Sequence, residues 1–104
     1  TARATQSGNA QVSNYPGKVR TKLRRAQRYP SAAKRQRLKG EAHVRFTIAR
    51  NGSVSAIRIV RSSGSDILDQ AAVDTVRRAA PFPRIPDGAG RSSWGFTVPL
   101  AFRR

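Results

Sequence analysis

The stretch Trp94–Phe102, WGFTVPLAF, carries the strongest strand pattern of the chain. Apolar residues recur in it at every second position, as in a strand with one buried face: Trp94, Phe96, Val98, Leu100 and Phe102. Pro99 interrupts the pattern, because proline lacks the backbone N–H that a strand paired on both sides needs. We therefore expect either an edge strand or a bulge at Pro99.

A β-hairpin is predicted upstream, in EAHVRFTIARNGSVSAIRIVRSS (residues 41–63). Its first half alternates apolar and polar residues, which is typical of a half-buried strand. Asn51-Gly52 favours a type I′ turn, since both residues tolerate positive φ. In the return strand Val54 is followed by Ile57 and Ile59, and this change of spacing predicts a bulge or a switch of face.

Between the hairpin and the final strand the period changes to that of a helix. The small apolar residues of DILDQAAVDTVRRA recur at intervals of four and three: Leu68, Ala72, Val76 and Ala79. Ser65 or Asp66 can cap the N-terminus of this helix, and Pro81 ends it. A proline- and glycine-rich connector, residues 80–93, then leads into the last strand.

The N-terminal part predicts a linker followed by two short helices. Residues 1–14 are small and polar, and we expect them to be the end of a flexible linker. Pro16–Gln27 fits a short basic helix with an apolar side of Val19, Leu23 and Ala26. A second short helix is expected to begin at Pro30–Ser31 and to end at Gly40.

These elements predict one α+β domain over residues 15–104. Its core is a three-stranded antiparallel sheet with helices packed on one face, preceded by the short basic helix. A chain of 104 residues is long enough for one such domain. There is no cysteine and no apolar run long enough to span a bilayer, and the chain begins without methionine. We expect it to be a fragment of a longer protein.

Charge is the dominant feature of the composition. The chain has 21 Lys+Arg against 5 Asp+Glu, a formal net charge of +16. The first forty residues hold eleven of the basic residues and no acidic residue. This balance favours polyanionic partners: nucleic acid, anionic lipid or an acidic protein surface.

Residues for catalysis or metal binding are few. We interpret His43 as a surface strand residue rather than a general base, and it has no second histidine or cysteine nearby for a metal site. Asp66, Asp69 and Asp74 lie at and after a helix N-terminus, where capping and solvation explain them better than a cation site. No phosphate-binding glycine motif is present. We expect no enzyme, no cofactor and no metal.

The ordered motifs resemble the C-terminal domain of the TonB family. They begin with YP-x-x-A and G-x-x-x-V-x-F-x-I, continue through NG-x-V, SSG, LD-x-A-A with its double arginine and P-F-P, and close on F-x-V-P-L-x-F. The resemblance covers residues 15–104. It implies a periplasmic domain of a protein that is anchored in the inner membrane of a Gram-negative bacterium, works with ExbB- and ExbD-like partners and uses the proton-motive force. Its task would be to bind the Ton box of an outer-membrane transporter for uptake of iron-siderophore, haem or cobalamin.

The resemblance also implies where the Ton box binds. In this family the Ton box adds to the last strand by β-augmentation, which places contacts at Ser93, Trp94, Gly95, Phe96, Thr97, Val98, Pro99 and Leu100. A second set lies in the family's QPxYP-like segment, here Gln27, Arg28, Tyr29 and Pro30. Tyr29-Pro30 match this motif, whereas the residues that precede them in this chain do not match the Gln and Pro of the family. Pro99 would then limit self-pairing of the exposed edge, although a bulge explains it as well.

Alternatives remain open at this point. The basic N-terminal segment can hold an acidic surface, peptidoglycan or anionic lipid, or its helix can occupy the docking edge until a receptor arrives. A TolA-like envelope domain shares the general layout. A nucleic-acid-binding module fits the charge, but the aromatic residues fall on the apolar phase of the strands rather than on an exposed stacking face. A homodimer through an exposed edge is also open.

Overall fold

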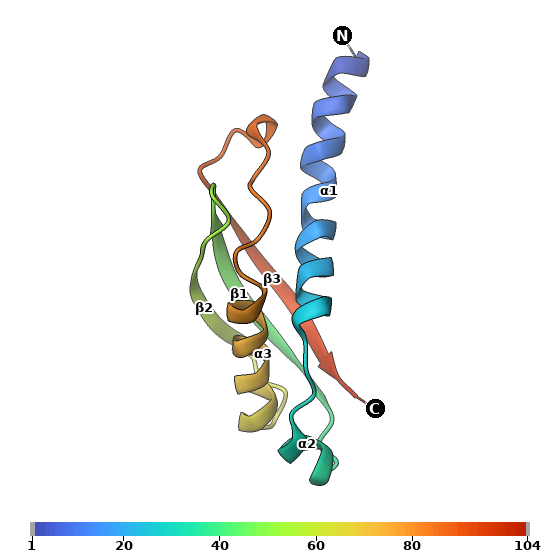
Figure 1. Ribbon diagram of the computed structural model, residues 1–104, viewed down its shortest axis with the longest axis vertical. Helices are drawn as coiled ribbons and strands as arrows, with labels where there is room; N and C mark the ends of the chain where they lie inside the picture. The colour runs from blue at the N-terminus through green and yellow to red at the C-terminus, as the bar shows by residue number, and fades with distance from the viewer. Residues whose placement is uncertain (1, 104) are drawn as a thin grey trace.

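The architecture is a three-stranded antiparallel sheet covered on one face by two helices (Figure 1). The computed structural model describes residues 2–103, with side chains from Val12 onward. The elements follow in the order α1 (Ala2–Ala26), α2 (Ser31–Arg35), β1 (Gly40–Ala49), β2 (Val54–Arg61), α3 (Asp66–Ala79), the 3₁₀ turn η1 (Asp87–Ala89) and β3 (Ser93–Phe102). The predicted α+β fold class is confirmed.

The strand order is β2-β1-β3, so the chain-terminal strand lies at an edge of the sheet. β1 and β3 pair over ten residues without a register shift, from Gly40 opposite Phe102 to Ala49 opposite Ser93. This continuous register excludes the bulge at Pro99, and the edge-strand interpretation is confirmed.

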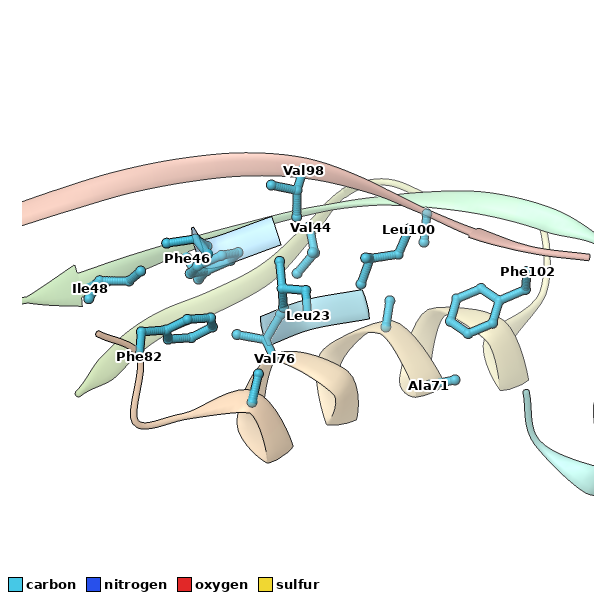
Figure 2. Packing of buried hydrophobic residues seen from close by; sticks show 14 of the residues in the cluster. Leu23, Val44, Phe46, Ile48, Ala71, Val76, Phe82, Val98, Leu100 and Phe102 are labelled. Carbon is cyan, nitrogen blue, oxygen red and sulfur yellow. The ribbon is translucent and has the colours of Figure 1, made fainter. Parts of the chain in front are cut away.

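The core lies between the sheet and the helices α1 and α3 (Figure 2). One face of β1 is fully buried: Ala42, Val44, Phe46 and Ile48. The cross-strand partners of these residues in β3 point to the same side, as the pleat requires. α3 buries the helical face predicted from its sequence, and Ser65 caps its N-terminus by accepting a hydrogen bond from the Leu68 N–H.

α1 is longer than predicted. It begins at Ala2 rather than at Pro16, so the described part of the predicted linker is helical and Pro16 lies inside the helix. A proline interior to a helix removes one intrahelical hydrogen bond. Here its neighbours hold the helix in place, because Tyr15, Val19 and Leu23 are all buried in the core. The division into a linker and a domain after residue 14 stays a prediction.

α2 is shorter than predicted, and Gly40 does not end it. The helix ends at Arg35, and Arg37 adopts a positive φ of 56° two residues later. Gly40 is instead the first residue of β1. A Cβ at Gly40 would lie 2.8 Å from the carbonyl oxygen of Ser63, so a close approach of the backbone explains this glycine.

The β1–β2 turn differs from the predicted type I′ turn, because Gly52 has a positive φ and Asn51 does not. The Gly52 N–H donates to the Ala49 carbonyl at 2.8 Å, which closes the turn one residue earlier. The backbone of Asn51 does not adopt the left-handed conformation. Its side-chain oxygen instead accepts hydrogen bonds from the N–H and the hydroxyl of Ser53. Gly52 also accepts a hydrogen bond from the Phe82 N–H, which ties the turn to the proline-rich connector.

We expect Gly52→Ala to lower the free energy of unfolding by about 2 kcal/mol. Gly52 has φ +94°, and a Cβ there would lie 2.0 Å from the Phe82 carbonyl oxygen. Thermal unfolding followed by circular dichroism measures the effect. Gly64→Ala is the matched control, since Gly64 has φ +93° but open space around it. Equal losses in the two variants would mean that backbone strain alone, without the contact to Phe82, explains the effect.

The irregular spacing in the return strand is confirmed as a bulge. The register between β1 and β2 shifts between Arg45 and Thr47, opposite Ala56, which has φ 55°. A second shift, between His43 and Val44, leaves Val60 unpaired in the register and half-exposed. β2, the other edge strand, is therefore bent and interrupted twice.

Candidate functional site: the open edge of β3

The backbone of β3 presents every second residue to the outer edge of the sheet. The Arg50 N–H donates to the Ser92 carbonyl at 2.9 Å, and the side chain of Gln27 donates to the Ala101 carbonyl at 2.7 Å from the other side. In an antiparallel pair the inward and outward groups alternate, so these two bonds set the phase for the whole strand. The outward residues are Ser93, Gly95, Thr97, Pro99 and Ala101.

This phase resolves the conflict between the strand pattern and Pro99. The missing N–H of Pro99 belongs to an outward position, so every bond between β3 and β1 can form. The outer edge then has a gap in its row of donors at Pro99. Gly95 and Thr97, nearer the start of the strand, keep both backbone groups directed outward, and no side chain of residues 12–103 bonds to them.

The two edges of the sheet differ in their fitness to accept another strand. β2 carries two register shifts, and such bulges protect an edge from pairing. β3 is regular over its ten residues. The residues whose backbone groups face outward have small or polar side chains, which lie on the open face of the sheet. The apolar side chains of β3, including those of Trp94 and Phe96, point toward the helices. The geometry favours β3 over β2 as the edge that a guest strand could join.

We expect Pro99→Val to increase self-association of the domain. The variant restores an outward N–H at the gap in each protomer, so a symmetric dimer gains two backbone hydrogen bonds. At about 1 kcal/mol each, they raise the dimerisation constant roughly thirtyfold. Sedimentation equilibrium measures this constant, with Thr97→Val as a control that changes no backbone donor. Unchanged association would contradict the role of Pro99 in limiting edge pairing.

The second predicted set of residues lies at the far end of β3. Gln27 bonds to Ala101, and the ring of Tyr29 packs against Phe102 with centroids 6.4 Å apart. The Tyr29 hydroxyl donates to the Leu38 carbonyl. Arg28 is exposed, and Pro30 precedes α2 with extended backbone (φ −59°, ψ 144°). The structure thus brings the segment 27–30 to the same edge as residues 93–100, although Gln27 and Tyr29 already have internal partners.

Sequence reasoning missed a groove between α1 and β3. It has a volume of about 450 Å³ and is lined by Arg20, Leu23, Arg24, Gln27, Val98, Pro99 and Leu100. α1 runs beside β3 in the same direction, since Tyr15 stacks on Trp94 and Gln27 reaches Ala101 (Figure 1). The signal in the sequence was the helical spacing of the residues at positions 20, 23, 24 and 27.

The remaining polar candidates have structural partners. His43 lies on the open face of the sheet and pairs with Glu41 at 2.9 Å. Asp69 accepts hydrogen bonds from Ser62 and from the N–H and hydroxyl of Ser63, which fixes the loop before α3. Within residues 2–103, no three metal-ligating side chains gather. None of the described helices combines the length and hydropathy needed to cross a membrane.

The hydrogen bonds to Asp69 predict that the stability of the domain depends on pH. Its burial raises the pKa, but the hydrogen bonds from Ser62 and Ser63 outweigh this effect, and the pKa lies below the ordinary value of 3.8. Because the folded protein binds the proton less tightly than the unfolded chain, the stabilisation is complete above the ordinary pKa and is lost as the pH falls through the folded pKa. We expect Asp69→Asn to flatten the decline of stability below about pH 4, measured by urea unfolding at several pH values. An identical slope in wild type and variant would contradict this.

The family assignment follows from comparisons with known proteins. A family model described as "Gram-negative bacterial TonB protein C-terminal" matches residues 25–103. The chain belongs to the TonB C-terminal family. TonB of Helicobacter pylori is 40% identical over 84 residues, which cover 79% of this chain and 30% of that protein. TonB of Pasteurella multocida is 33% identical over 93 residues, which cover 89% and 35%. The chain spans about a third of the length of these curated relatives.

Solved structures of two C-terminal domains share the fold. The solution structure of the H. pylori TonB C-terminal domain matches with a TM-score of 0.76 and 34% identity, over 95% of this chain and 90% of that one. The C-terminal domain of HasB matches with a TM-score of 0.54 and 36% identity, over 86% and 69%. The first match extends over nearly the whole chain. The resemblance seen in the sequence motifs is therefore confirmed, and the TolA-like alternative is set aside.

Proposed function

We propose that this TonB-type domain binds the Ton box of an outer-membrane transporter by adding it as a fourth strand to β3. The observation that carries the proposal is the regular, open edge at Ser93–Thr97, beside a second edge that two bulges disrupt. Backbone hydrogen bonds would supply the affinity, so the interaction makes few demands on the guest sequence. The contact residues are those of the two predicted sets, 93–100 and 27–30.

The same proposal includes the rest of the system. The domain transmits work derived from the proton-motive force rather than catalysing a reaction. It lies in the periplasm, and the protein to which it belongs is anchored in the inner membrane and driven by ExbB- and ExbD-like partners. The transported nutrients would be iron-siderophore, haem or cobalamin. Membership in the TonB family and the length of its relatives support this assignment.

Binding of nucleic acid is the weaker candidate. The open face of the sheet carries polar side chains such as His43, Arg45 and Thr47, with no aromatic residue among its described members. The aromatic rings are stacked on the other face, where Tyr15 and α3 cover them. A single-strand binder needs exposed stacking rings, so only the charge of the chain favours this function.

An NMR amide-shift titration tests the proposal. The labelled domain is titrated with Ton-box peptides from transporters of the same organism at about 0.15 M salt, where weak charge attraction is screened. We expect saturable shifts at Gly95, Thr97 and their β1 partners, with smaller shifts near Tyr29. Shifts confined to the basic residues of the first forty would overturn strand addition and favour a polyanionic partner.

A further inference from the structure

The groove between α1 and β3 begins where the open edge loses backbone partners. Pro99 has no N–H to donate, although its carbonyl faces outward, and the Ala101 carbonyl already accepts the Gln27 side chain. A guest strand that pairs with Gly95 and Thr97 therefore loses one donor at Pro99 and one acceptor at Ala101. Its next residues are held less firmly in the line of the strand and lie beside the groove, which Pro99 lines.

The surface available to those residues has an apolar floor and a cationic rim. Leu23, Val98 and Leu100 are buried side chains that lie together on the helix side of the sheet (Figure 2). Arg20 and Arg24, one helical turn apart on α1, form the rim and are exposed. Neither arginine has an acidic partner among the described residues, and no acidic side chain lines the groove.

We propose that this groove selects guest segments that carry a carboxylate next to their strand-forming part, with Arg20 and Arg24 as the specificity-determining residues. The inference rests on the strand addition proposed above. The guest pairs with Ser93–Thr97, turns at Pro99 and places its acidic side chain between the two guanidinium groups. A neutral flank leaves both arginines solvated and binds through the strand alone.

Three short capped peptides with one alternating threonine–valine core test this. They carry an aspartate pair at the N-terminal end, an aspartate pair at the C-terminal end, or asparagines at both ends. Only one acidic end can lie beside Pro99: the C-terminal end in a guest parallel to β3, and the N-terminal end in an antiparallel guest. By NMR titration we expect one acidic peptide to bind roughly fivefold to tenfold more tightly than the asparagine peptide, since two charge-assisted contacts are gained.

Two double variants separate the groove from general charge attraction. Arg20→Gln/Arg24→Gln is expected to abolish the advantage of the acidic peptide and to leave binding of the asparagine peptide unchanged. Lys34→Gln/Arg35→Gln, on α2 and outside the groove, removes the same charge and is expected to preserve the advantage. Equal gains for both acidic peptides, or equal effects of the two variants, would overturn the inference.

The same titrations distinguish a failure of this inference from a failure of the proposed function. If the asparagine peptide shifts the amides of Gly95 and Thr97 but no acidic peptide gains affinity, strand addition stands and the role of the groove is wrong. If none of the peptides shifts those amides, strand addition itself fails, and the inference fails with it.

Discussion

Thr97→Pro is expected to abolish binding of Ton-box peptides while the domain stays folded. Thr97 is an outward residue of β3, opposite Arg45 of β1, so its N–H is available to a guest and not to β1. Proline there removes this donor and places its ring on the path of the incoming strand. We expect the dissociation constant to rise more than tenfold, because a lost hydrogen bond and a steric block act together.

Thr97→Val is the matched control, since it alters the side chain and keeps the N–H. Its peptide affinity should stay within about twofold of wild type, because the exposed Arg45–Thr97 side-chain contact of 3.2 Å is weak. Near-unchanged peptide binding by a folded Thr97→Pro variant would contradict strand addition at this edge.

The phase of β3 can be checked with the neighbouring residue. Phe96 directs its backbone N–H and carbonyl toward β1 and its ring toward the core. The centroids of the Phe96 and Phe46 rings are 6.0 Å apart. Phe96→Pro is therefore expected to unfold the domain, in contrast to Thr97→Pro. Circular dichroism distinguishes the two outcomes, and a folded Phe96→Pro variant would show that the assigned phase is wrong.

The features of the fold that could be predicted from the sequence are those with local causes. The alternation of β3, the helical face of α3 and the irregular spacing after Val54 each reflect packing of neighbouring residues on one element. Even the conflict at Pro99 was informative, since only an edge strand accommodates a proline in regular register.

The features that were missed depend on contacts between distant segments. Gly40 looked like a helix stop, but a close approach of Ser63 explains it. Gly52 is a turn residue with positive φ, as expected, but its close approach to Phe82 could not be predicted. The N-terminus of α1 was misplaced because Pro16 resembles a helix start. The groove was missed because the helical spacing at positions 20, 23, 24 and 27 reveals only its α1 wall, and the other wall is the end of β3. Tyr15 could have been found, because it continues the four-residue spacing of Val19 and Leu23.

Tyr15→Ala is expected to cause a large loss of stability, about 3–4 kcal/mol, without unfolding the domain. Its side chain is 1% exposed and stacks on Trp94 with centroids 5.2 Å apart. Its hydroxyl donates to the Pro83 carbonyl at 2.6 Å, and burial raises its pKa above 10.0, which keeps the donor protonated. The change removes the ring that joins α1 to both β3 and the proline-rich connector, so the melting temperature should fall by about 15 °C or more.

Tyr15→Phe separates the ring from the hydroxyl. It keeps the stacking on Trp94 but leaves the Pro83 carbonyl without its donor, so we expect a loss of only about 1 kcal/mol. Calorimetry on both variants then decides whether this part of α1 contributes to the stability of the core. A large loss for Ala and a small one for Phe makes this part of α1 a component of the core, which holds the groove open at a defined width. Equal, small losses would mean that α1 rests on the sheet without contributing to its stability, and the groove would then have no fixed wall.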